Sequence, residues 1–205
     1  MVPLALAASA VLYSVWTLEF FLDTPIAPLH AYTSELAAFD QPSGWLFRWC
    51  DLAAGILVVG AGALGLRRYR HRWIWIALIV FGAATVLDSQ WSLSCAPTGD
   101  DACATAEAAG SVPLTHRLHT VSSTTASAAA LVAIVMFAWT ARGEGRLGRV
   151  AVVLAAVLVV STVWTLAAVF VDSTVGLAQR TQLMSFAISL VILAVATRQG
   201  RKCFT

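Results

Sequence analysis

The segment VAVVLAAVLVVSTVWTLAAVFV, at residues 150–171, runs for 22 residues without a charged side chain. Crossing the roughly 30 Å of hydrocarbon in a bilayer takes about 20 apolar residues in an α-helix. The segment is therefore predicted to span a membrane. Arg149 precedes it and Asp172 follows it, so that a base marks one end of the segment and an acid marks the other.

Five more apolar segments of similar length occur in the chain of 205 residues. Hydrophobic residues make up 59% of the chain and charged residues 12%, about half the charged fraction of a soluble domain. We therefore predict an all-α polytopic membrane bundle, a single domain over residues 1–205 with six transmembrane helices. The expected helices cover about 3–22, 45–66, 73–94, 113–139, 150–171 and 179–197.

The charged residues fall into two sets that alternate along the chain, one basic apart from Glu144 and the other acidic apart from Arg48, Arg117 and Arg180. One set of connections and ends is basic and holds Arg67, Arg68, Arg70, Arg72, Arg142, Arg146, Arg149, Arg198, Arg201 and Lys202. The other set is acidic and holds Glu19, Asp23, Glu35, Asp40, Asp51, Asp88, Asp100, Asp101, Glu107 and Asp172. Short loops rich in Arg and Lys stay in the cytoplasm. Both termini are therefore expected in the cytoplasm, and loops 23–44, 95–112 and 172–178 outside it.

The basic residues form short clusters beside the helices, which is typical of orientation signals, so nucleic-acid binding is not expected. Twelve of the thirteen Lys and Arg residues are Arg, and Ala and Val are abundant. This composition suggests a GC-rich bacterial genome. The expected location is therefore a bacterial plasma membrane, which the chain crosses several times.

Two cysteines, Cys95 and Cys103, lie in one loop that is expected to face the oxidising side of the membrane. An even number of cysteines in such a loop predicts a disulfide that closes a small ring. The alternative is a pair of free thiols. Cys50 lies inside a predicted helix and Cys203 on the reducing side, so neither is an expected partner.

Several ionisable side chains fall inside the predicted membrane helices, where each costs roughly 2.5–3.5 kcal/mol and usually faces the bundle interior. At a rise of 1.5 Å per residue, they lie within roughly 10 Å of the outer interface on five of the six helices. They are Glu19, Asp51, Asp88, His116, His119 and Arg180. This shared depth predicts a polar site near the extracytoplasmic face, and the candidates for catalytic roles are His116, His119, Asp88, Asp51 and Arg180.

His116 and His119 are three residues apart, so one face of the fourth predicted helix carries both. With Asp88 they could supply three ligands to a zinc ion and leave a fourth position for water; His30 and Asp51 are further possible ligands. Zinc would acidify that water and let it attack an ester or an amide. The chain could then be an intramembrane, metal-dependent hydrolase.

Two alternatives do without a metal. One is a functional pocket that contains no ion. The other is a structural network that fixes the register of the helices through ion pairs, namely Asp88 with His119 or Arg117, and Asp51 with Arg48 or Arg180. A pair of histidines is also a weaker signal than a complete metalloprotease motif with its internal glutamate.

Small hydroxyl side chains follow the histidines, in the run Ser122–Ser127. They could line a cavity, or they could bond to the backbone of their own helix. Ser34 is a weak candidate nucleophile because no nucleophile-elbow glycines flank it.

Several short stretches of the chain resemble the family of six-helix bacterial and archaeal membrane proteins known as domain of unknown function 998. They are Tyr32-Thr33-Ser34-Glu35-Leu36, Gln41-Pro42, Leu46-Phe47-Arg48 with Asp51 and Gly55, His116-Arg117-Leu118-His119, and Gly176-Leu177-Ala178-Gln179-Arg180. The resemblance covers most of the chain. It implies a compact six-helix bundle, and it implies no particular activity.

A lipid-directed role fits these observations best, because a lipid presents its headgroup at the depth of the predicted polar site. The protein would bind or process a lipid of the outer leaflet. The alternative is a structural or partner-binding membrane subunit without catalysis, which would use its outer loops to bind a membrane-protein partner. A proton-coupled transporter needs ionisable groups near the midplane, and the inner halves of the predicted helices are apolar.

Overall fold

The computed structural model describes residues 1–171 and 174–200, and within these residues the chain is all-α, with seven α-helices, two 3-10 helices and no strand. The elements are α1 (Val2–Tyr13), η1 (Val15–Phe20), η2 (Thr33–Ala37), α2 (Gly44–Arg68), α3 (Arg72–Gln90), α4 (Asp101–Ala108), α5 (Leu114–Ala141), α6 (Gly145–Val171) and α7 (Val175–Arg198).

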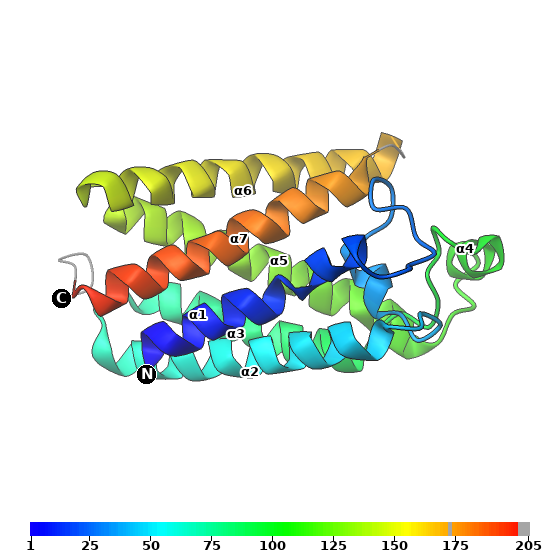
Figure 1. The fold of residues 1–205 in the computed structure, drawn as a ribbon, viewed down its shortest axis with the longest axis horizontal. Coiled ribbons are helices and arrows are strands. Elements are labelled where there is room, and N and C mark those ends of the chain that lie inside the picture. The colour runs from blue at the N-terminus through cyan, green and yellow to red at the C-terminus, as the bar shows by residue number, and fades with distance from the viewer. Residues whose placement is uncertain (172–173, 201–205) are drawn as a thin grey trace.

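Six long helical segments form a closed ring in chain order (Figure 1). α2 packs between α1 and α3, α5 packs between α3 and α6, and α7 closes the ring between α6 and α1. Across the ring, α5 and α7 meet only sparsely. Within the described residues, six helical segments are long and apolar enough to cross a bilayer, and the first combines α1 with η1. The chain is therefore a multi-pass membrane protein, as the sequence predicts.

The first predicted helix, 3–22, is not continuous. α1 ends at Tyr13, and the chain goes on as the tighter 3-10 helix η1. Two hydroxyls bond to backbone carbonyls at this break: Ser14 Oγ donates to Ala10 O at 2.7 Å, and Thr17 Oγ1 donates to Ser14 O at 2.8 Å. Such side-chain bonds compete with the regular helix ladder and favour a change of helix type.

One further boundary and one loop differ from the prediction. The sixth membrane helix begins at Val175 rather than at 179, which leaves a shorter connection than 172–178. The predicted loop 95–112 contains α4, whose first turn is capped by the Asp100 carboxylate accepting a hydrogen bond from Ala102 N at 2.9 Å. An N-cap acid followed by an alanine-rich run favours a helix.

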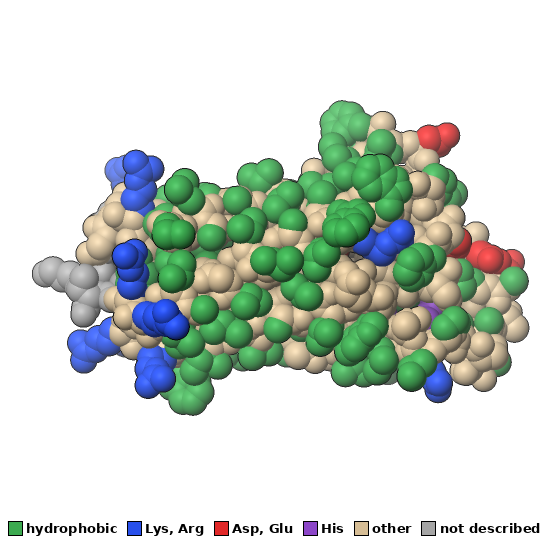
Figure 2. Space-filling view, turned by 90° about the horizontal axis from the view of Figure 1, so that it is seen from below, with side chains coloured by type: hydrophobic (Ala, Val, Ile, Leu, Met, Phe, Trp, Pro, Cys, Tyr) green, Lys and Arg blue, Asp and Glu red, His purple; other side chains and the backbone are tan. Residues whose placement is uncertain are grey.

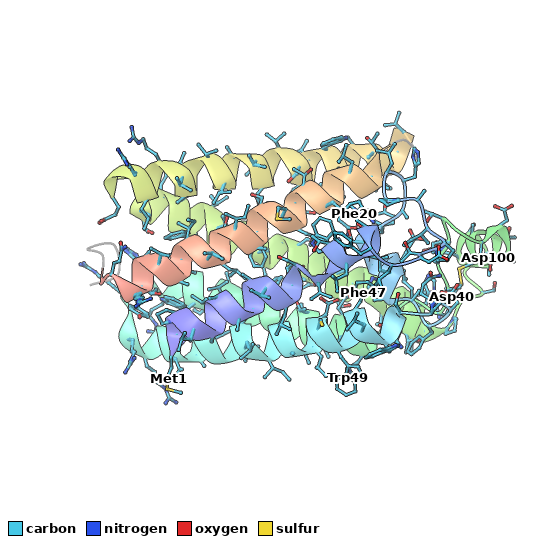
Figure 3. The ribbon with its side chains drawn as sticks, in the orientation of Figure 1. Met1, Phe20, Asp40, Phe47, Trp49 and Asp100 are labelled. Carbon is cyan, nitrogen blue, oxygen red and sulfur yellow. A yellow bond between two sulfur atoms is a disulfide. The ribbon has the colours of Figure 1, made fainter. Side chains whose placement is uncertain are left out.

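The connections at one end of the ring fold together into a cap, which we define as residues 21–43 and 91–113. Phe39 N donates to Leu93 O at 2.9 Å, and Ala96 N donates to Asp40 Oδ2 at 3.0 Å. Figure 3 shows Asp40 and Asp100 at this end of the molecule, with Trp49 projecting from the side of the bundle. The two cap segments are thus one packed unit rather than separate loops.

The predicted disulfide between Cys95 and Cys103 is present, with their Cα atoms 6.0 Å apart. It closes a small ring within the second cap segment and ties the first turn of α4 to the residues just before that helix. Cys50 is a free cysteine in α2, and Cys203 lies outside the described residues.

Two hydrophobic clusters fill the interior. The body cluster runs through the ring and includes Leu6, Val58, Phe81, Phe137 and Leu190. The cap cluster lies where the cap meets the ring and consists of Trp16, Ile26, Ala31, Leu36, Ala37, Ala38, Phe47, Leu93 and Ala96. Polar side chains gather between these two clusters.

The charges separate along the long axis of the molecule. In Figure 2, most of the Lys and Arg side chains on the visible face gather at one end, the acidic side chains gather at the other, and hydrophobic side chains cover the middle. The N-terminus and the end of α7 lie at the basic end, opposite the cap (Figure 1). Asp172, Arg201 and Lys202, which the sequence assigns to these two sets, lie outside the described residues.

Candidate functional site

A polar cavity of about 70 Å³ lies between the body cluster and the cap cluster. We call it the inner chamber. It is large enough for several water molecules. Its polar lining includes Tyr13, Ser34, Asp51, Thr85, Asp88, Ser123, Ser127 and Gln179, which come from α1, η2, α2, α3, α5 and α7.

Two predicted site residues, Asp51 and Asp88, project into this chamber from neighbouring helices. Ser122 Oγ donates a hydrogen bond to Asp88 Oδ1, and His119 Nδ1 lies 3.1 Å from the same oxygen. Asp51 accepts no hydrogen bond from a described residue. The structure thus brings both carboxyl groups to one cavity and gives only one of them close polar neighbours.

The two predicted basic partners of Asp51 are engaged elsewhere. Arg48 donates to Ala37 O at 2.8 Å, and its guanidinium lies over the ring of Phe39. Arg180 is paired with Glu19. The predicted pairing of Asp51 with either arginine is therefore wrong, and the interhelical network has different partners from those expected.

His116 and His119 share a helix face, yet they contact different groups. His116 Nδ1 accepts a hydrogen bond from Ser94 N at 3.1 Å, and its Nε2 lies 3.6 Å from Glu107 Oε1 in the cap. His119 instead lies beside Asp88, so the predicted pairing of these two residues is present. Neither ring nitrogen of His119 makes a hydrogen bond to a described residue, although the side chain is only 8% exposed.

The divergence of the two histidines bears on the predicted zinc site. Metal ligands must all lie at about 2 Å from one ion. Among residues 1–171 and 174–200, no group of three His, Cys, Asp or Glu side chains is placed to hold a metal ion. The geometry therefore gives the combination of His116, His119 and Asp88 no support as a ligand set. His30, the other possible ligand, is exposed in the cap and lines neither the inner chamber nor the cleft described below.

Arg180 forms the most complete ion pair of the capped end. Its Nε donates to Glu19 Oε1 at 2.6 Å and its Nη2 to Glu19 Oε2 at 2.5 Å, a bidentate arrangement. Its Nη1 donates to Ala31 O at 2.8 Å and to Gly176 O at 3.1 Å. The side chain of Glu19 is 0% exposed and that of Arg180 is 6% exposed. All three guanidinium nitrogens are used, which favours a structural role for Arg180, and its catalytic role stays a prediction.

Glycine is required next to this ion pair. A Cβ added to Gly176 would collide with Pro28 O and lie 2.6 Å from Ala31 O, so only glycine lets the first turn of α7 approach the cap so closely. The stretch from Gly176 to Arg180 thus carries both the close contact and the buried base.

A second, larger cavity of about 370 Å³ opens between α5, α6 and α7 beneath the cap. We call it the outer cleft. Its polar lining includes Tyr32, Ser34, Glu107, His119, Thr120, Ser123, Thr124, Ser127, Thr162, Thr165, Gln179 and Gln182. Ser34, Ser123, Ser127 and Gln179 also line the inner chamber, so these four side chains form the wall between the two cavities.

Of the hydroxyl side chains of α5, some bond to the backbone of their own helix and others line a cavity. Ser122 and Thr125 bond to backbone carbonyls of their own helix. Thr120, Ser123, Thr124 and Ser127 line the outer cleft, and their hydroxyls make no hydrogen bond to a described residue. These four positions follow the spacing of one helix face. The cleft therefore presents a row of hydroxyls that are available to a ligand.

A shallow lateral groove lies on the outside of the bundle between α3 and α5. It is lined by Trp73, Ile76, Ala77, Val80, Thr120, Val121, Thr124, Thr125, Ala128, Ala129, Val132 and Met136. Most of these side chains are apolar. Thr120 and Thr124 belong to both the groove and the outer cleft, so the two surfaces meet along these residues.

The sequence does not predict two of the residues that hold the site together. Glu35 is fully buried, and its carboxylate accepts hydrogen bonds from Tyr32 N at 2.9 Å, from Thr98 N at 2.9 Å and from Thr98 Oγ1 at 2.6 Å. Gln179 Oε1 accepts from Thr33 N at 2.6 Å. Both belong to stretches that carry the family resemblance, which was the available signal. Ser34 lines both cavities. Its hydroxyl makes no hydrogen bond to a described residue, and therefore none to a basic side chain.

The structural role of Arg180 can be tested with Arg180→Gln. Removing one partner of a buried ion pair leaves the other charge uncompensated and costs about 3–5 kcal/mol of unfolding free energy. We expect Arg180→Gln and Glu19→Gln each to lower the thermal unfolding midpoint strongly in detergent micelles. The double variant should lose less than the sum of the single losses. Exposed Arg117→Gln is the matched control. An Arg180→Gln midpoint equal to that of the control would contradict a structural role.

The comparisons with known proteins give a family and no closer relative. The chain matches the model of the family described as protein of unknown function (DUF998) over residues 6–196. Comparison with curated proteins and with solved structures finds no match. The matched range includes every residue of the inner chamber, the outer cleft and the cap. With nearly its whole length matched, the chain belongs to the DUF998 family.

Proposed function

We propose that this protein binds a membrane lipid, with the headgroup in the outer cleft and one acyl chain in the lateral groove. The observation that carries the proposal is the junction of the two surfaces at Thr120 and Thr124. A cleft that carries hydroxyl and amide side chains and an apolar groove that shares its edge match the two parts of an amphiphile. Neither surface alone would distinguish a lipid from a water-soluble ligand or from another apolar helix.

The depth of the cleft supports a headgroup ligand. α5 has 28 residues, which corresponds to about 42 Å, close to the thickness of a bilayer with both headgroup regions. Thr120 lies six residues from the start of α5 at Leu114, or about 9 Å along the helix. The unpartnered hydroxyls therefore begin near the level where headgroups meet hydrocarbon.

The lateral groove suits an extended chain. It runs along α5 from Thr120 to Met136, a distance of about 24 Å. Lipid tails are as apolar as the groove, so the chain gains little from the hydrophobic effect by entering it. Close packing in the groove selects the shape of the chain, and the polar contacts in the cleft supply most of the preference for one headgroup.

A more specific function would be that the protein also processes the lipid that it binds. His119 supports it, because its Nε2 has no described partner and its side chain lines the outer cleft. A zinc-dependent hydrolase is not part of the proposal, since the described residues offer no set of three metal ligands. We therefore propose lipid binding as the function.

A second candidate, binding of a partner protein without catalysis, rests on α4. This short helix projects from the capped end of the bundle (Figure 1). The disulfide holds it in place, and Asp100, Asp101 and Glu107 give it an exposed acidic surface. A basic membrane-protein partner would fit this surface. The lipid function is preferred because it accounts for both the cleft and the groove.

We also infer that the cap lies outside the cytoplasm. The Arg-rich end of the bundle matches the composition of cytoplasmic loops, and the disulfide at the other end suits an oxidising compartment. In a bacterial plasma membrane, the outer cleft would then reach lipids of the outer leaflet.

The orientation can be tested with reporter fusions in a bacterial host. Green fluorescent protein fused after residue 205 should fluoresce, because the basic end is expected in the cytoplasm. Alkaline phosphatase inserted after Gly110, which lies in the cap, should be active, because that enzyme needs an oxidising compartment to form its disulfides. The inverse pattern, with a dark C-terminal fusion and an inactive phosphatase, would reverse the orientation.

The lipid function can be tested by filling the groove. Ala128 is exposed on the groove side of α5, and Ala128→Trp would occupy the path of the chain. We expect the affinity for co-purifying lipid to fall by about tenfold, a change of ~1.4 kcal/mol, in native mass spectrometry. The control is Ala156→Trp, an equal substitution on the exposed face of α6 away from the groove and the cleft. Equal lipid retention by the two variants would count against the proposed function.

A further inference from the structure

We infer that the lipid bound by the outer cleft has a neutral, polyhydroxylated headgroup, such as a sugar or a glycerol unit, rather than a phosphate. This inference rests on the proposed lipid function and names the class of lipid. It is carried by the chemistry of the cleft lining, in which hydroxyl and amide groups are abundant and no described residue is Arg or Lys.

The hydroxyls suit a ligand that is itself rich in hydroxyls. Each hydroxyl can donate one hydrogen bond and accept two. Thr120, Ser123, Thr124 and Ser127 retain all of this capacity, because none bonds to a described residue. By contrast, Thr165 Oγ1 already donates to Ser161 O at 2.9 Å. A row of groups that both donate and accept complements the hydroxyls of a polyol, which do the same.

Two amide side chains on α7 add fixed donors and acceptors. Gln179 uses its Oε1 to accept from Thr33 N, which leaves its Nε2 as a donor for the cleft. Gln182 uses its Nε2 to donate to Thr162 Oγ1 at 2.9 Å, which leaves its Oε1 as an acceptor. The hydrogen bonds that these amides make to the protein fix which way round each amide lies. The cleft wall therefore offers one oriented donor and one oriented acceptor beside the flexible hydroxyls.

The charges around the cleft disfavour an anionic headgroup. Proteins recognise phosphate chiefly with Arg and Lys, and no described residue that lines the cleft is either one. The buried base nearest in sequence to the two amides, Arg180, is neutralised by Glu19. Glu107 places a carboxylate in the cleft lining, and His119 lies beside Asp88. A phosphate would lose its water shell there without gaining a free cation in exchange.

The experiment compares headgroups on identical acyl chains. The purified full chain is held in a polyoxyethylene detergent, which carries no sugar, and binding is measured by native mass spectrometry. The probes are a monoglycosyl diacylglycerol, phosphatidic acid and, as a chain-free source of the same hydroxyls, methyl glucoside. The variants are Ser123→Ala combined with Thr124→Val, and the control Thr181→Val, whose hydroxyl bonds to its own helix at Leu177 O.

We expect the glycosyl lipid to bind at least about tenfold more tightly than phosphatidic acid, and the double variant to lose about tenfold of that affinity. The control should bind as the unmodified protein does. Tighter binding of phosphatidic acid that is weakened by the same double variant would overturn the headgroup class and leave the lipid function standing. Lipid binding unaffected by both the double variant and Ala128→Trp would overturn the lipid function itself. If methyl glucoside binds as tightly as the glycosyl lipid, the cleft recognises a polyol, but the conclusion that this polyol belongs to a lipid is overturned.

Discussion

The buried ion pair between Glu19 and Arg180 is the interaction on which the capped end depends. Two charges that are almost fully removed from solvent are tolerable only when each satisfies the other. Arg180 meets that requirement by binding both oxygens of Glu19 and the carbonyl of Ala31. One side chain thereby joins η1, the first cap segment and α7. The ends of the first and last membrane helices are held together from inside the bundle.

This attachment shapes the two cavities. With the cap held against α7, the inner chamber lies between the body cluster and the cap cluster. Of the neighbouring helices in the ring, α5 and α6 make the sparsest contact, and the outer cleft opens there, between α5, α6 and α7. Glu35 fastens the second cap segment to the first near the same opening, and the disulfide cross-links the second segment internally. The polar site is therefore a consequence of how the cap is fastened, and its lining comes from helices that lie far apart in sequence.

Much of the architecture could be predicted from the sequence because it follows from composition and from the length of the apolar segments. Apolar length gives the six membrane segments, and the two cysteines of one loop give the disulfide. The Glu19–Arg180 pair was not predicted because its members are 161 residues apart and nothing local connects them. α4 was not predicted either, since a short polar helix has no apolar stripe, although the Asp100 cap was a usable signal.

The polar site shows where helical spacing stops being informative. Spacing places His116 and His119 on one face of α5, but the cap draws His116 toward Ser94 and Glu107 while His119 lies beside Asp88. The hydroxyl run presents the same difficulty. Nothing in the sequence distinguishes Thr125, which bonds to its own helix, from Thr124, which does not. The surroundings of each side chain decide its partner, and those surroundings exist only in the folded bundle.

The most direct test of the proposed lipid site is a crystal structure of the protein grown from a bilayer that contains a glycosyl diacylglycerol brominated along one chain. Anomalous scattering then locates the bromine atoms without any assumption about the lipid. The account predicts bromine peaks in the lateral groove between Thr124 and Val132, with headgroup density against the hydroxyls of the outer cleft. Bromine peaks confined to other faces of the bundle, with no headgroup density in the cleft, would contradict it.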